Sequence, residues 1–445
     1  MILPVSELLV TEDLLHYLWK FRLFQQRGLE TTDGHSLDII SVGIHNKHAG
    51  PDFDNVKIKI DNTIWAGSVE IHIRSSDWEH HKHQLDKAYE NVVLHVVYQH
   101  DKQIAHDDGT IIPVLVLQNL VPDIIALQYQ KLMNAQNWIP CQYQLPKIDA
   151  FYIETWLSRL LIERFEERIQ WIDALLLGNK GSWNNAFYIA LAKGFGFKTN
   201  ALPFELLARS IPQQILAKHK NNALQVEALL FGQAGFLTED LVDDYPNKLR
   251  IEYLFLQKKY SLTPLDRHLW KFMRLRPYNF PTLRLAQFAA LMVKPGHLFS
   301  QILDGQNVQQ IRKLFENLVV HPYWQTHYRF DIKAVKYSND LGDQSIINLS
   351  INVISIFLFA YGKQMGDETY MNRAIVLLEK LSPEVNQTIN RFKEIGIKVD
   401  RAHTSQALLQ LKARYCDKKK CLHCGIGMKL LNYNQMEDNR FCYTI

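Results

Sequence analysis

Apolar residues recur at helical spacing near the start of the chain. The repeat consists of Leu8, Leu9, Leu14, Leu15, Leu18, Trp19 and Phe24. Positions three and four apart share one face of a helix, so this spacing predicts an amphipathic helix within residues 6–27. Thr11-Glu12-Asp13 has the composition of a helix start, and we expect the helix to begin there.

The pattern then changes to the period of two that strands show. Residues 56–60 alternate apolar side chains with lysine, and Asp61-Asn62 predicts a tight turn into the next strand. Ser76-Asp77 predicts the cap of a polar helix over residues 78–89. The expected strands are residues 37–42, 56–60, 63–74, 92–98 and 111–117. This order predicts a mixed α/β (α+β) unit that ends near residue 120.

Beyond residue 120 the apolar residues repeat with the period of 3.6 that helices show. Most of the prolines fall between the periodic stretches, as helix breakers do. These stretches are residues 151–177, 201–208, 223–231, 283–292, 308–318 and 346–361. The predicted domains are therefore residues 1–120, a mainly α-helical domain over 121–410, and a cysteine-containing segment over 411–445.

Composition narrows the class of protein. The chain has 445 residues, of which 47% are hydrophobic and 22% charged, which is typical of a globular protein with more than one domain. No apolar run reaches the roughly 20 residues that cross a bilayer, and the N-terminus lacks the basic start of a signal peptide. We therefore expect a cytoplasmic protein without a membrane partner. The net charge of +4 permits nucleic-acid binding without indicating it.

The first expected site contains two carboxylates and a histidine. Asp52 lies at the start of the second strand, and Glu70 and His72 lie two residues apart in the third, where their side chains share a face. Neighbouring strands bring two such carboxylates onto one Mg²⁺ or Mn²⁺ ion. Asp52 and Glu70 are the predicted metal ligands, and His72 is predicted to hold or activate the attacking water. The alternative is that Glu70 and His72 form the solvent face of an exposed strand.

This arrangement resembles the PD-(D/E)XK, or restriction-endonuclease-like, nuclease superfamily. The resemblance covers about residues 6–117 and includes Pro51-Asp52 and Glu70-Ile71-His72. It implies a restriction-endonuclease-like sheet and metal-dependent cleavage of phosphodiester bonds in DNA or RNA. His72 departs from the pattern, because the superfamily has lysine at that position.

Other residues near this pattern are candidate accessory groups. Asp54 is close enough to replace Asp52, and the first helix or its exit offers a further carboxylate. His80, His81 and His83, together with His72 and His95, would provide a separate Zn²⁺ or Mn²⁺ site, but His81 and His83 lie two apart on the expected helix and should diverge. His95 lies inside an apolar strand, where a core role is the alternative. The accessory candidates are Asp54, Glu12, Glu30, Asp86, Tyr89 and His95.

Three cysteines cluster near the C-terminus as Cys416-x4-Cys421-x2-Cys424. This spacing is typical of a Zn²⁺ knuckle, for which His423, Cys442 or Cys141 would be the fourth ligand. Buried free thiols are the alternative. The superfamily resemblance adds an iron-sulfur cluster, since some of its nucleases bind one through C-terminal cysteines.

Residues 270–284 interleave cations with aromatic side chains, as surfaces that bind nucleic acid do. A helical corner with exposed cationic ends is the alternative. Lys193, Lys198, Lys218 and Lys220 would extend the surface. The candidate contacts within it are Lys271, Arg274, Arg276 and Arg284.

The chain also resembles, over nearly its full length, a bacterial family known only as a domain of unknown function. The phrases that carry the resemblance are residues 50–53, 69–72, 75–78, 94–97 and 416–427. It implies that the three parts work as one protein but supplies no activity. Three functions remain open: a metal-dependent nuclease, an inactive nuclease-like protein that binds nucleic acid or a partner, and an unrelated metallohydrolase that uses the histidines.

Overall fold

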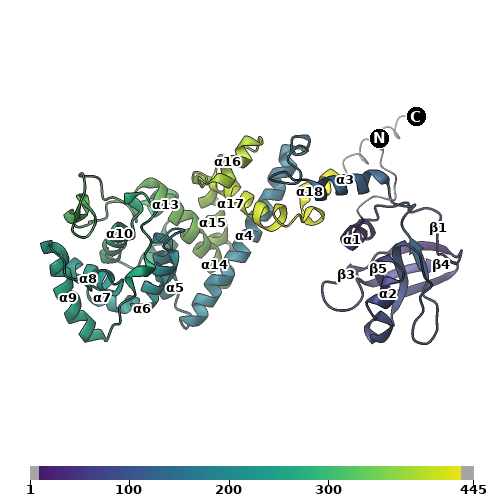
Figure 1. Cartoon of the computed structure of the whole chain (residues 1–445), viewed down its shortest axis with the longest axis horizontal. Helices are drawn as coiled ribbons and strands as arrows, with labels where there is room; N and C mark the ends of the chain where they lie inside the picture. The colour runs from purple at the N-terminus through teal and green to yellow at the C-terminus, as the bar shows by residue number, and fades with distance from the viewer. Residues whose placement is uncertain (1–9, 432–445) are drawn as a thin grey trace. The chain divides into compact units, whose positions relative to one another are not determined.

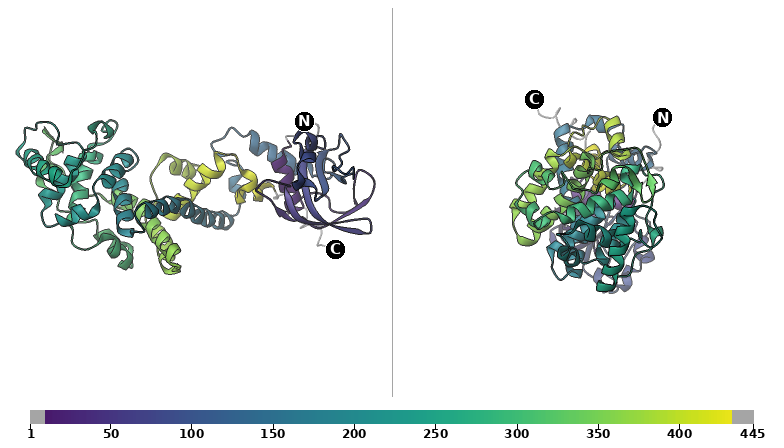
Figure 2. Two further views of the ribbon diagram at one scale, coloured as in Figure 1. Left: turned by 90° about the horizontal axis from the view of Figure 1, so that it is seen from below. Right: turned by 90° about the vertical axis from the view of Figure 1, so that its left-hand side faces the viewer.

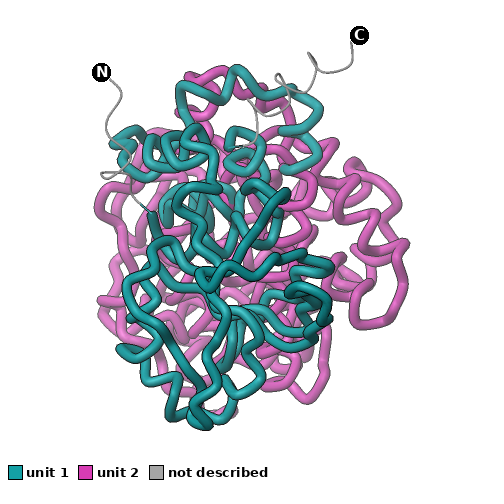
Figure 3. Tube along the Cα trace, turned by 90° about the vertical axis from the view of Figure 1, so that its right-hand side faces the viewer, with its two compact units in different colours: residues 1–156, 411–445 teal, residues 157–410 magenta. Residues whose placement is uncertain are grey.

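The computed structural model describes residues 10–431, and the chain divides into two compact units. Unit 1 comprises residues 1–156 and 411–445, and unit 2 comprises residues 157–410 (Figure 3). The sequence placed boundaries near residues 120 and 410. In the structure, residues 121–156 and the described part of the C-terminal segment belong with the sheet of unit 1. Unit 1 is therefore assembled from both ends of the described chain.

The first helix, α1 (Glu12–Phe21), begins where the sequence predicts. The Thr11 side chain accepts a hydrogen bond from the backbone N–H of Leu14 and caps the helix. The helix stops at Arg22, which adopts a left-handed conformation with φ 54°. Its buried face packs against strand β5 of the sheet (Figure 1, Figure 2). Residues 6–9 of the predicted helix lie outside the described residues.

Unit 1 contains a mixed sheet with the order β1-β2-β4-β5-β6-β7, in which β3 also pairs with β4. The strands from β1 to β5 pair antiparallel, whereas β5, β6 and β7 pair parallel. The five predicted strands are all present, although the last is shorter than expected. The strands are β1 (Leu29–Glu30), β2 (Ser36–Ser41), β3 (Ile44–His45), β4 (Phe53–Ile60), β5 (Thr63–Arg74), β6 (Val92–Gln99) and β7 (Val114–Val116).

The segment between β5 and β6 differs from the single helix predicted over residues 78–89. It contains the short helix α2 (Asp77–His80) and two 3-10 turns, η2 (His83–Leu85) and η3 (Lys87–Tyr89). Lys82 adopts φ 62° and Asp86 is extended, so neither residue continues a helix. The prediction of one continuous helix is therefore wrong.

The remainder of unit 1 is helical and includes the C-terminal cysteines. α18 packs against α3, and the Tyr152 hydroxyl at the start of α4 donates to the carbonyl of Gly425 over 3.1 Å. The elements are α3 (Asp123–Asn134), η4 (Leu145–Lys147), the first turns of α4 (Ala150–Gly178), η9 (Lys412–Cys416), η10 (Cys421–His423) and α18 (Gly425–Leu431).

Unit 2 is mainly helical, as the period of 3.6 predicts, with a small ribbon of β8 (His327–Arg329) and β9 (Ile332–Lys333). Its helices after α4 are α5 (Trp183–Phe195), α6 (Ala201–Ser210), α7 (Gln213–Lys218), α8 (Ala223–Gln233), α9 (Asp244–Tyr260), α10 (Pro281–Val293), α11 (Leu298–Asp304), α12 (Val308–Lys313), α13 (Asp343–Leu349), α14 (Ser355–Met365), α15 (Glu368–Lys380), α16 (Gln387–Glu394) and α17 (Ala402–Leu411).

The apolar stretch Asp343–Met365 in unit 2 is long and apolar enough to cross a membrane. It combines α13, a π-helical turn at Ser350–Ile354 and α14. Within the structure, 78% of its most apolar window is buried, as is usual for the central helix of a helical domain.

Candidate metal centre

Asp52 and Glu70 lie side by side where β4 begins. Phe53 of β4 pairs with Val69 of β5, so the residues next to this pair are neighbours. The backbone N–H of Asp52 donates to Glu70 Oε2 over 3.1 Å, and the N–H of Ile71 donates to Asp52 Oδ2 over 3.0 Å. Each strand thus donates a backbone hydrogen bond to a carboxylate of the other strand, and these two bonds fix both side chains.

β5 is a central strand, and its polar residues at this point are buried. It lies between β4 and β6, and Glu70 and His72 are only 5% and 1% exposed. The alternative in which these two side chains form a solvent face is therefore wrong. Buried polar groups in a sheet require partners, and the partners here are other titratable side chains.

His72 is held by His95 of the neighbouring strand. Glu70 and His95 are register partners, so their side chains and that of His72 share a face. His72 Nδ1 lies 2.8 Å from His95 Nε2. Burial, followed by the nearby histidines, lowers the pKa of His72 to about 2 and that of His95 to about 3. Both imidazoles are therefore neutral, which is the form that binds metal ions.

His81 and His83 converge on His72 instead of diverging. The left-handed conformation of Lys82 ends the helical path between them, so their rings come to 5.4 Å between centroids. His72, His81 and His83 offer ligand atoms that all lie within 4.8 Å of one another. The expectation that His81 and His83 diverge is wrong because it assumed a helix through this turn. His80, just before the turn, is 74% exposed and contacts Asp77 instead.

Neighbouring polar atoms in this cluster are spaced as the ligands of one small ion are. His72 Nε2 lies 3.1 Å from His81 Nδ1 and 3.5 Å from Glu70 Oε1. Glu70 Oε1 lies 3.2 Å from His83 Nε2. Ligands that bind a tetrahedral ion at about 2.0–2.1 Å lie about 3.3 Å apart. The three histidines therefore form a group that could hold a transition-metal ion, and Glu70 contacts two of them. We call Glu70, His72, His81 and His83 the histidine–glutamate cluster.

The environment of the cluster shifts the pKa of Glu70 and of Tyr89. Burial raises the pKa of Glu70, and Asp52 raises it further, although contact with His83 opposes the shift. The Tyr89 ring stacks on His83 with 3.9 Å between centroids. Burial and the charges of Glu70 and Asp52 raise the pKa of Tyr89 to about 12, so its hydroxyl stays protonated. Tyr89 thus positions His83, whereas Asp86 is exposed and caps the turn through Ala88 N–H.

α1 contributes two further groups, Glu12 and His16, which are four residues apart on one face of the helix. His16 Nε2 lies 3.0 Å from Asp52 Oδ2. Burial disfavours protonation of His16, but Asp52 outweighs this effect and raises its pKa. Burial also raises the pKa of Glu12, whose charge interacts with His81 and Asp52. His16 was not predicted, although its spacing from Glu12 was a usable signal.

Two predicted accessory carboxylates do not join the cluster. The Asp54 carboxylate accepts a hydrogen bond from the Ser68 hydroxyl over 3.1 Å. Glu30 is exposed and pairs with Ser36, which binds Asp61 at the turn between β4 and β5. That turn lies at the opposite end of β4 from Asp52. Glu30 is therefore excluded by the register of the sheet.

The predicted basic surface over residues 270–284 divides into exposed and buried parts. Lys271, Arg274 and Arg276 are exposed. Arg284 lies in α10 and is only 3% exposed, and its guanidinium donates to Gln287 and Ser345 over 2.9 Å each. The prediction that Arg284 contacts nucleic acid is wrong, because its side chain is buried and its two terminal guanidinium nitrogens bind groups inside unit 2.

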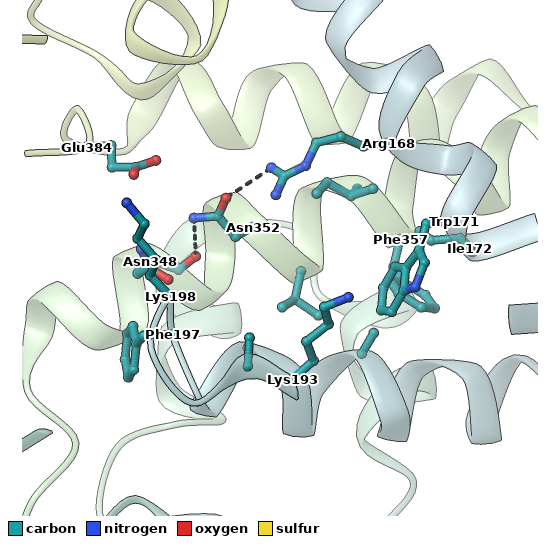
Figure 4. Close-up of a pocket in the computed structure, with 15 residues that line it drawn as sticks. Arg168, Trp171, Ile172, Lys193, Phe197, Lys198, Asn348, Asn352, Phe357 and Glu384 are labelled. Carbon is teal, nitrogen blue, oxygen red and sulfur yellow. Dashed lines mark hydrogen bonds between the residues drawn. The ribbon is translucent and has the colours of Figure 1, made fainter. Parts of the chain in front are cut away.

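Unit 2 also has a cavity of about 470 Å³ (Figure 4). Its wall is largely apolar but includes Arg168, Lys193 and Lys198, with Glu384 as a carboxylate. Arg168 donates to the Asn352 side chain over 2.9 Å. Lys193 is paired with Glu205 over 2.9 Å and lies 4.0 Å from the centre of the Trp171 ring. The cavity therefore combines aromatic surface with positive charge.

Comparison with known protein families gives one match. A family described as "Protein of unknown function (DUF2851)" matches residues 12–387, which include α1, the whole sheet and most of unit 2. Neither the curated proteins nor the solved structures give a match.

Proposed function

The chain belongs to this family of unknown function, and we propose that it is a divalent-metal-dependent hydrolase that cleaves phosphodiester bonds in nucleic acid. The observation that carries the proposal is the histidine–glutamate cluster, in which His72, His81 and His83 offer ligand atoms within 4.8 Å of one another and Glu70 Oε1 lies 3.2 Å from His83 Nε2. The choice of phosphodiesters is supported by Asp52 beside Glu70 and by the similarity of Pro51-Asp52 and Glu70-Ile71-His72 to the PD-(D/E)XK pattern.

The ligand types favour Mn²⁺ or Zn²⁺ over Mg²⁺. Mg²⁺ prefers oxygen ligands, whereas imidazole nitrogen suits the transition metals. In our proposal His72 donates its Nδ1 proton to His95 and offers the Nε2 lone pair, with Glu70, His81 and His83 as the other ligands. His95 thus orients a ligand from behind, as partners of metal-bound histidines usually do.

The site also has a side that is open to substrate. His81 is exposed, whereas His72 is buried, so a water or a phosphate oxygen reaches the cluster from the side of His81. A bound ion would polarise the phosphoryl group and lower the pKa of a water molecule. Asp52 fixes the backbone of Ile71 and, through its own N–H, the carboxylate of Glu70. These bonds keep Glu70 in place as the charge at the phosphorus changes.

Calorimetric titration with Mn²⁺, Zn²⁺ and Mg²⁺, combined with a cleavage assay on single- and double-stranded DNA and RNA, tests the proposal. We expect His81→Ala/His83→Ala and Asp52→Ala/Glu70→Ala to lose both metal binding and cleavage. His80→Ala is the matched control, since His80 lies in the same segment but outside the cluster. Unchanged metal affinity in both double variants would refute the proposal.

A second candidate function is binding of nucleic acid without cleavage. It is favoured by the exposed Lys271, Arg274 and Arg276. Arg329 adds a stacked cation, 4.3 Å from the centre of the Phe272 ring. The nuclease superfamily has lysine where this chain has the neutral His72, and this loss of charge also favours binding without cleavage. Binding that persists in Asp52→Ala/Glu70→Ala, together with no cleavage by the wild type under any of the three metals, would select this candidate.

A further inference from the structure

The cavity in unit 2 takes no part in the proposed hydrolase. Its volume of about 470 Å³ falls within the range of about 300–1,000 Å³ that is usual for pockets that bind small molecules. Its wall is built by α4, by α5 and the loop after it, by the apolar stretch Asp343–Met365 and by the segment after α15. All of these segments belong to unit 2, so the cavity is complete within that unit.

The polar part of the wall is mainly cationic. Its charged side chains are three cations and one carboxylate, which leaves two positive charges in excess. Glu205, outside the wall, does not neutralise this excess, because its carboxylate is shared between Lys193 at 2.9 Å and Arg209 at 2.8 Å. A phosphate monoester carries about −1.5 to −2 charges at pH 7, which matches the excess better than a single carboxylate does. The cations are Arg168, Lys193 and Lys198, and the carboxylate is Glu384.

Arg168 is the cation that most clearly lacks a charged partner. Its guanidinium donates to the Asn352 side chain over 2.9 Å, and no carboxylate within residues 10–431 forms an ion pair with it. The Asn352 amide in turn donates to the carbonyl of Asn348 over 3.2 Å, which fixes the orientation of the guanidinium. Burial, followed by the charge of Arg164, lowers the pKa of Arg168 to about 10, so the group is still charged at neutral pH. A charged guanidinium held by an amide alone favours an anion at its remaining donors.

Two aromatic rings of the wall offer surface to a planar group. Trp171 and Phe197 both line the cavity and are both partly exposed. Arg284 lies 4.6 Å from the centre of the Phe197 ring, and Lys193 lies 4.0 Å from that of Trp171. Exposed rings beside cations are the combination on which nucleic-acid bases stack. The wall therefore suits a ligand that joins a planar ring to an anion.

The backbone is strained or irregular at two points of this wall. Phe197 adopts a left-handed conformation with φ 49°, which is unfavourable for a residue that has a Cβ atom. Asn352 lies in the π-helical turn Ser350–Ile354 between α13 and α14. Both features are found most often at functional sites. Here they bring a ring and the amide that orients Arg168 to the same cavity (Figure 4).

We propose that the cavity of unit 2 binds a nucleoside monophosphate. The cations of the wall bind its phosphate, and Trp171 and Phe197 provide the surfaces on which its base stacks. Glu384 and the carboxamide of Asn348 are the partners for its hydroxyl groups and ring nitrogens. The site is separate from the metal centre of unit 1, so it exists whether or not the chain is a hydrolase.

Calorimetric titration of the full chain in the presence of EDTA tests the proposal, because metal in unit 1 then cannot bind phosphate. The probes are the four ribonucleoside 5′-monophosphates, the matching nucleosides and inorganic phosphate. We expect a monophosphate to bind at one site per chain, about 10-fold or more tightly than its nucleoside and than phosphate. A nucleoside that binds as tightly as its monophosphate would overturn the role of the cations. Phosphate that binds as tightly would overturn that of the rings, and no binding of any monophosphate at millimolar concentration would overturn the proposal.

Variants of the wall locate the site. Asn352→Asp keeps the shape of the side chain and supplies the carboxylate that Arg168 lacks, so nucleotide affinity should fall by about 10-fold or more. Trp171→Leu should weaken binding of the nucleotide but not that of phosphate. Lys198→Ala removes an exposed cation of the wall and should also lower the affinity, whereas Lys258→Ala removes an exposed cation of α9 outside the cavity and is the matched control.

Thermal unfolding of each variant separates loss of binding from loss of fold. Nucleotide affinity that is unchanged in both Asn352→Asp and Lys198→Ala would place the nucleotide elsewhere and overturn the site. An equal loss in Lys258→Ala would show that the overall charge of unit 2, not the cavity, attracts the nucleotide.

Discussion

Two polar clusters in this protein each contain a buried glutamate but differ in how their polar atoms are paired. In unit 2, Glu227 accepts a hydrogen bond from the Tyr245 hydroxyl over 3.0 Å, and Tyr245 accepts one from Trp324 over 3.2 Å. Each donor there points at an acceptor, and the chain of bonds ends on the Glu227 carboxylate. In unit 1, His72, His81 and His83 bring imidazole nitrogens within 4.8 Å of one another, and Glu70 Oε1 lies 3.2 Å from His83 Nε2.

This difference separates a structural network from a site. Burial and a shifted pKa occur in both places, since burial raises the pKa of Glu227 to about 7 and also raises that of Glu70. Neither property alone identifies function. Lone pairs that converge do identify function, because they repel one another until a cation binds between them. The comparison therefore predicts that metal will stabilise unit 1 and leave unit 2 unaffected.

The largest expected effect is the loss of metal binding in Glu70→Gln. The amide keeps the shape but removes the charge that faces His83 and His72, so metal affinity should fall by more than about 100-fold. Cleavage should fall with it. Calorimetric titration with Mn²⁺ and Zn²⁺ measures the change. Glu227→Gln is the matched control in unit 2, and equal loss of affinity in both variants would contradict the distinction drawn here.

Arg284→Met should lower the free energy of unfolding by about 3 kcal/mol, because the buried amide of Gln287 and hydroxyl of Ser345 lose their partner. Metal affinity of the folded protein should not change. Chemical denaturation with and without Mn²⁺ would show both results. A variant as stable as the wild type would mean that the Arg284 network is not structural.

The stability of unit 2 should fall as pH rises from about 4.5 to 7. Glu227 keeps its proton to higher pH in the folded state than in the unfolded state, so the folded state binds more protons in this window and loses that advantage above it. The shift corresponds to at most about 3 kcal/mol. Glu227→Gln should remove this part of the pH dependence and be the more stable protein at pH 8. Thermal unfolding across this range measures it, and an unchanged pH profile would argue against a buried acid.

His95→Gln should have a smaller effect, a loss of about 10-fold in metal affinity, because His95 touches only the far side of His72. Glutamine can still accept a hydrogen bond, whereas His95→Leu cannot and should lose more. A comparison of the two variants by metal titration isolates the hydrogen bond from the packing. Equal affinities for both would show that His95 serves only the core.

The smallest effect on stability is expected for Lys271→Ala/Arg274→Ala/Arg276→Ala, within about 0.5 kcal/mol per residue, since these side chains are exposed. If they contact phosphates, nucleic-acid affinity should fall and its dependence on salt should become less steep. Binding measured at several salt concentrations tests this. An unchanged salt dependence would assign the segment to structure alone.

Residues with strong local patterns were predictable from the sequence. The start of α1 followed from Thr11 and the acidic first turn, and the pairing of β4 with β5 followed from Asp61-Asn62. The pairing of β4 with β5 placed Asp52 beside Glu70. The convergence of His81 and His83 could not be predicted, because it depends on a left-handed lysine at position 82, which has no characteristic sequence.

The roles of other residues depend on the tertiary structure and could not be predicted from the sequence. His16 reaches Asp52 only because α1 packs on β5, and Arg284 is buried only because α10 lies inside unit 2. A sequence shows that an arginine lies among aromatic residues, but not which side of the helix faces the core. The sequence therefore did not distinguish the buried Arg284 from the exposed Lys271, Arg274 and Arg276.

The insertion of unit 2 within unit 1 has a consequence for biosynthesis. The sheet, with Asp52, Glu70 and the nearby histidines, leaves the ribosome early, but residues 411–431, which complete the described part of unit 1, follow only after residues 157–410. At about 5–20 residues per second, this delay lasts roughly ten to fifty seconds. During that time the nascent sheet lacks η9, η10 and α18. The N-terminal part of unit 1 therefore waits for its C-terminal helices until synthesis is almost complete. A chain that terminated before residue 411 would lack part of the unit that was made first.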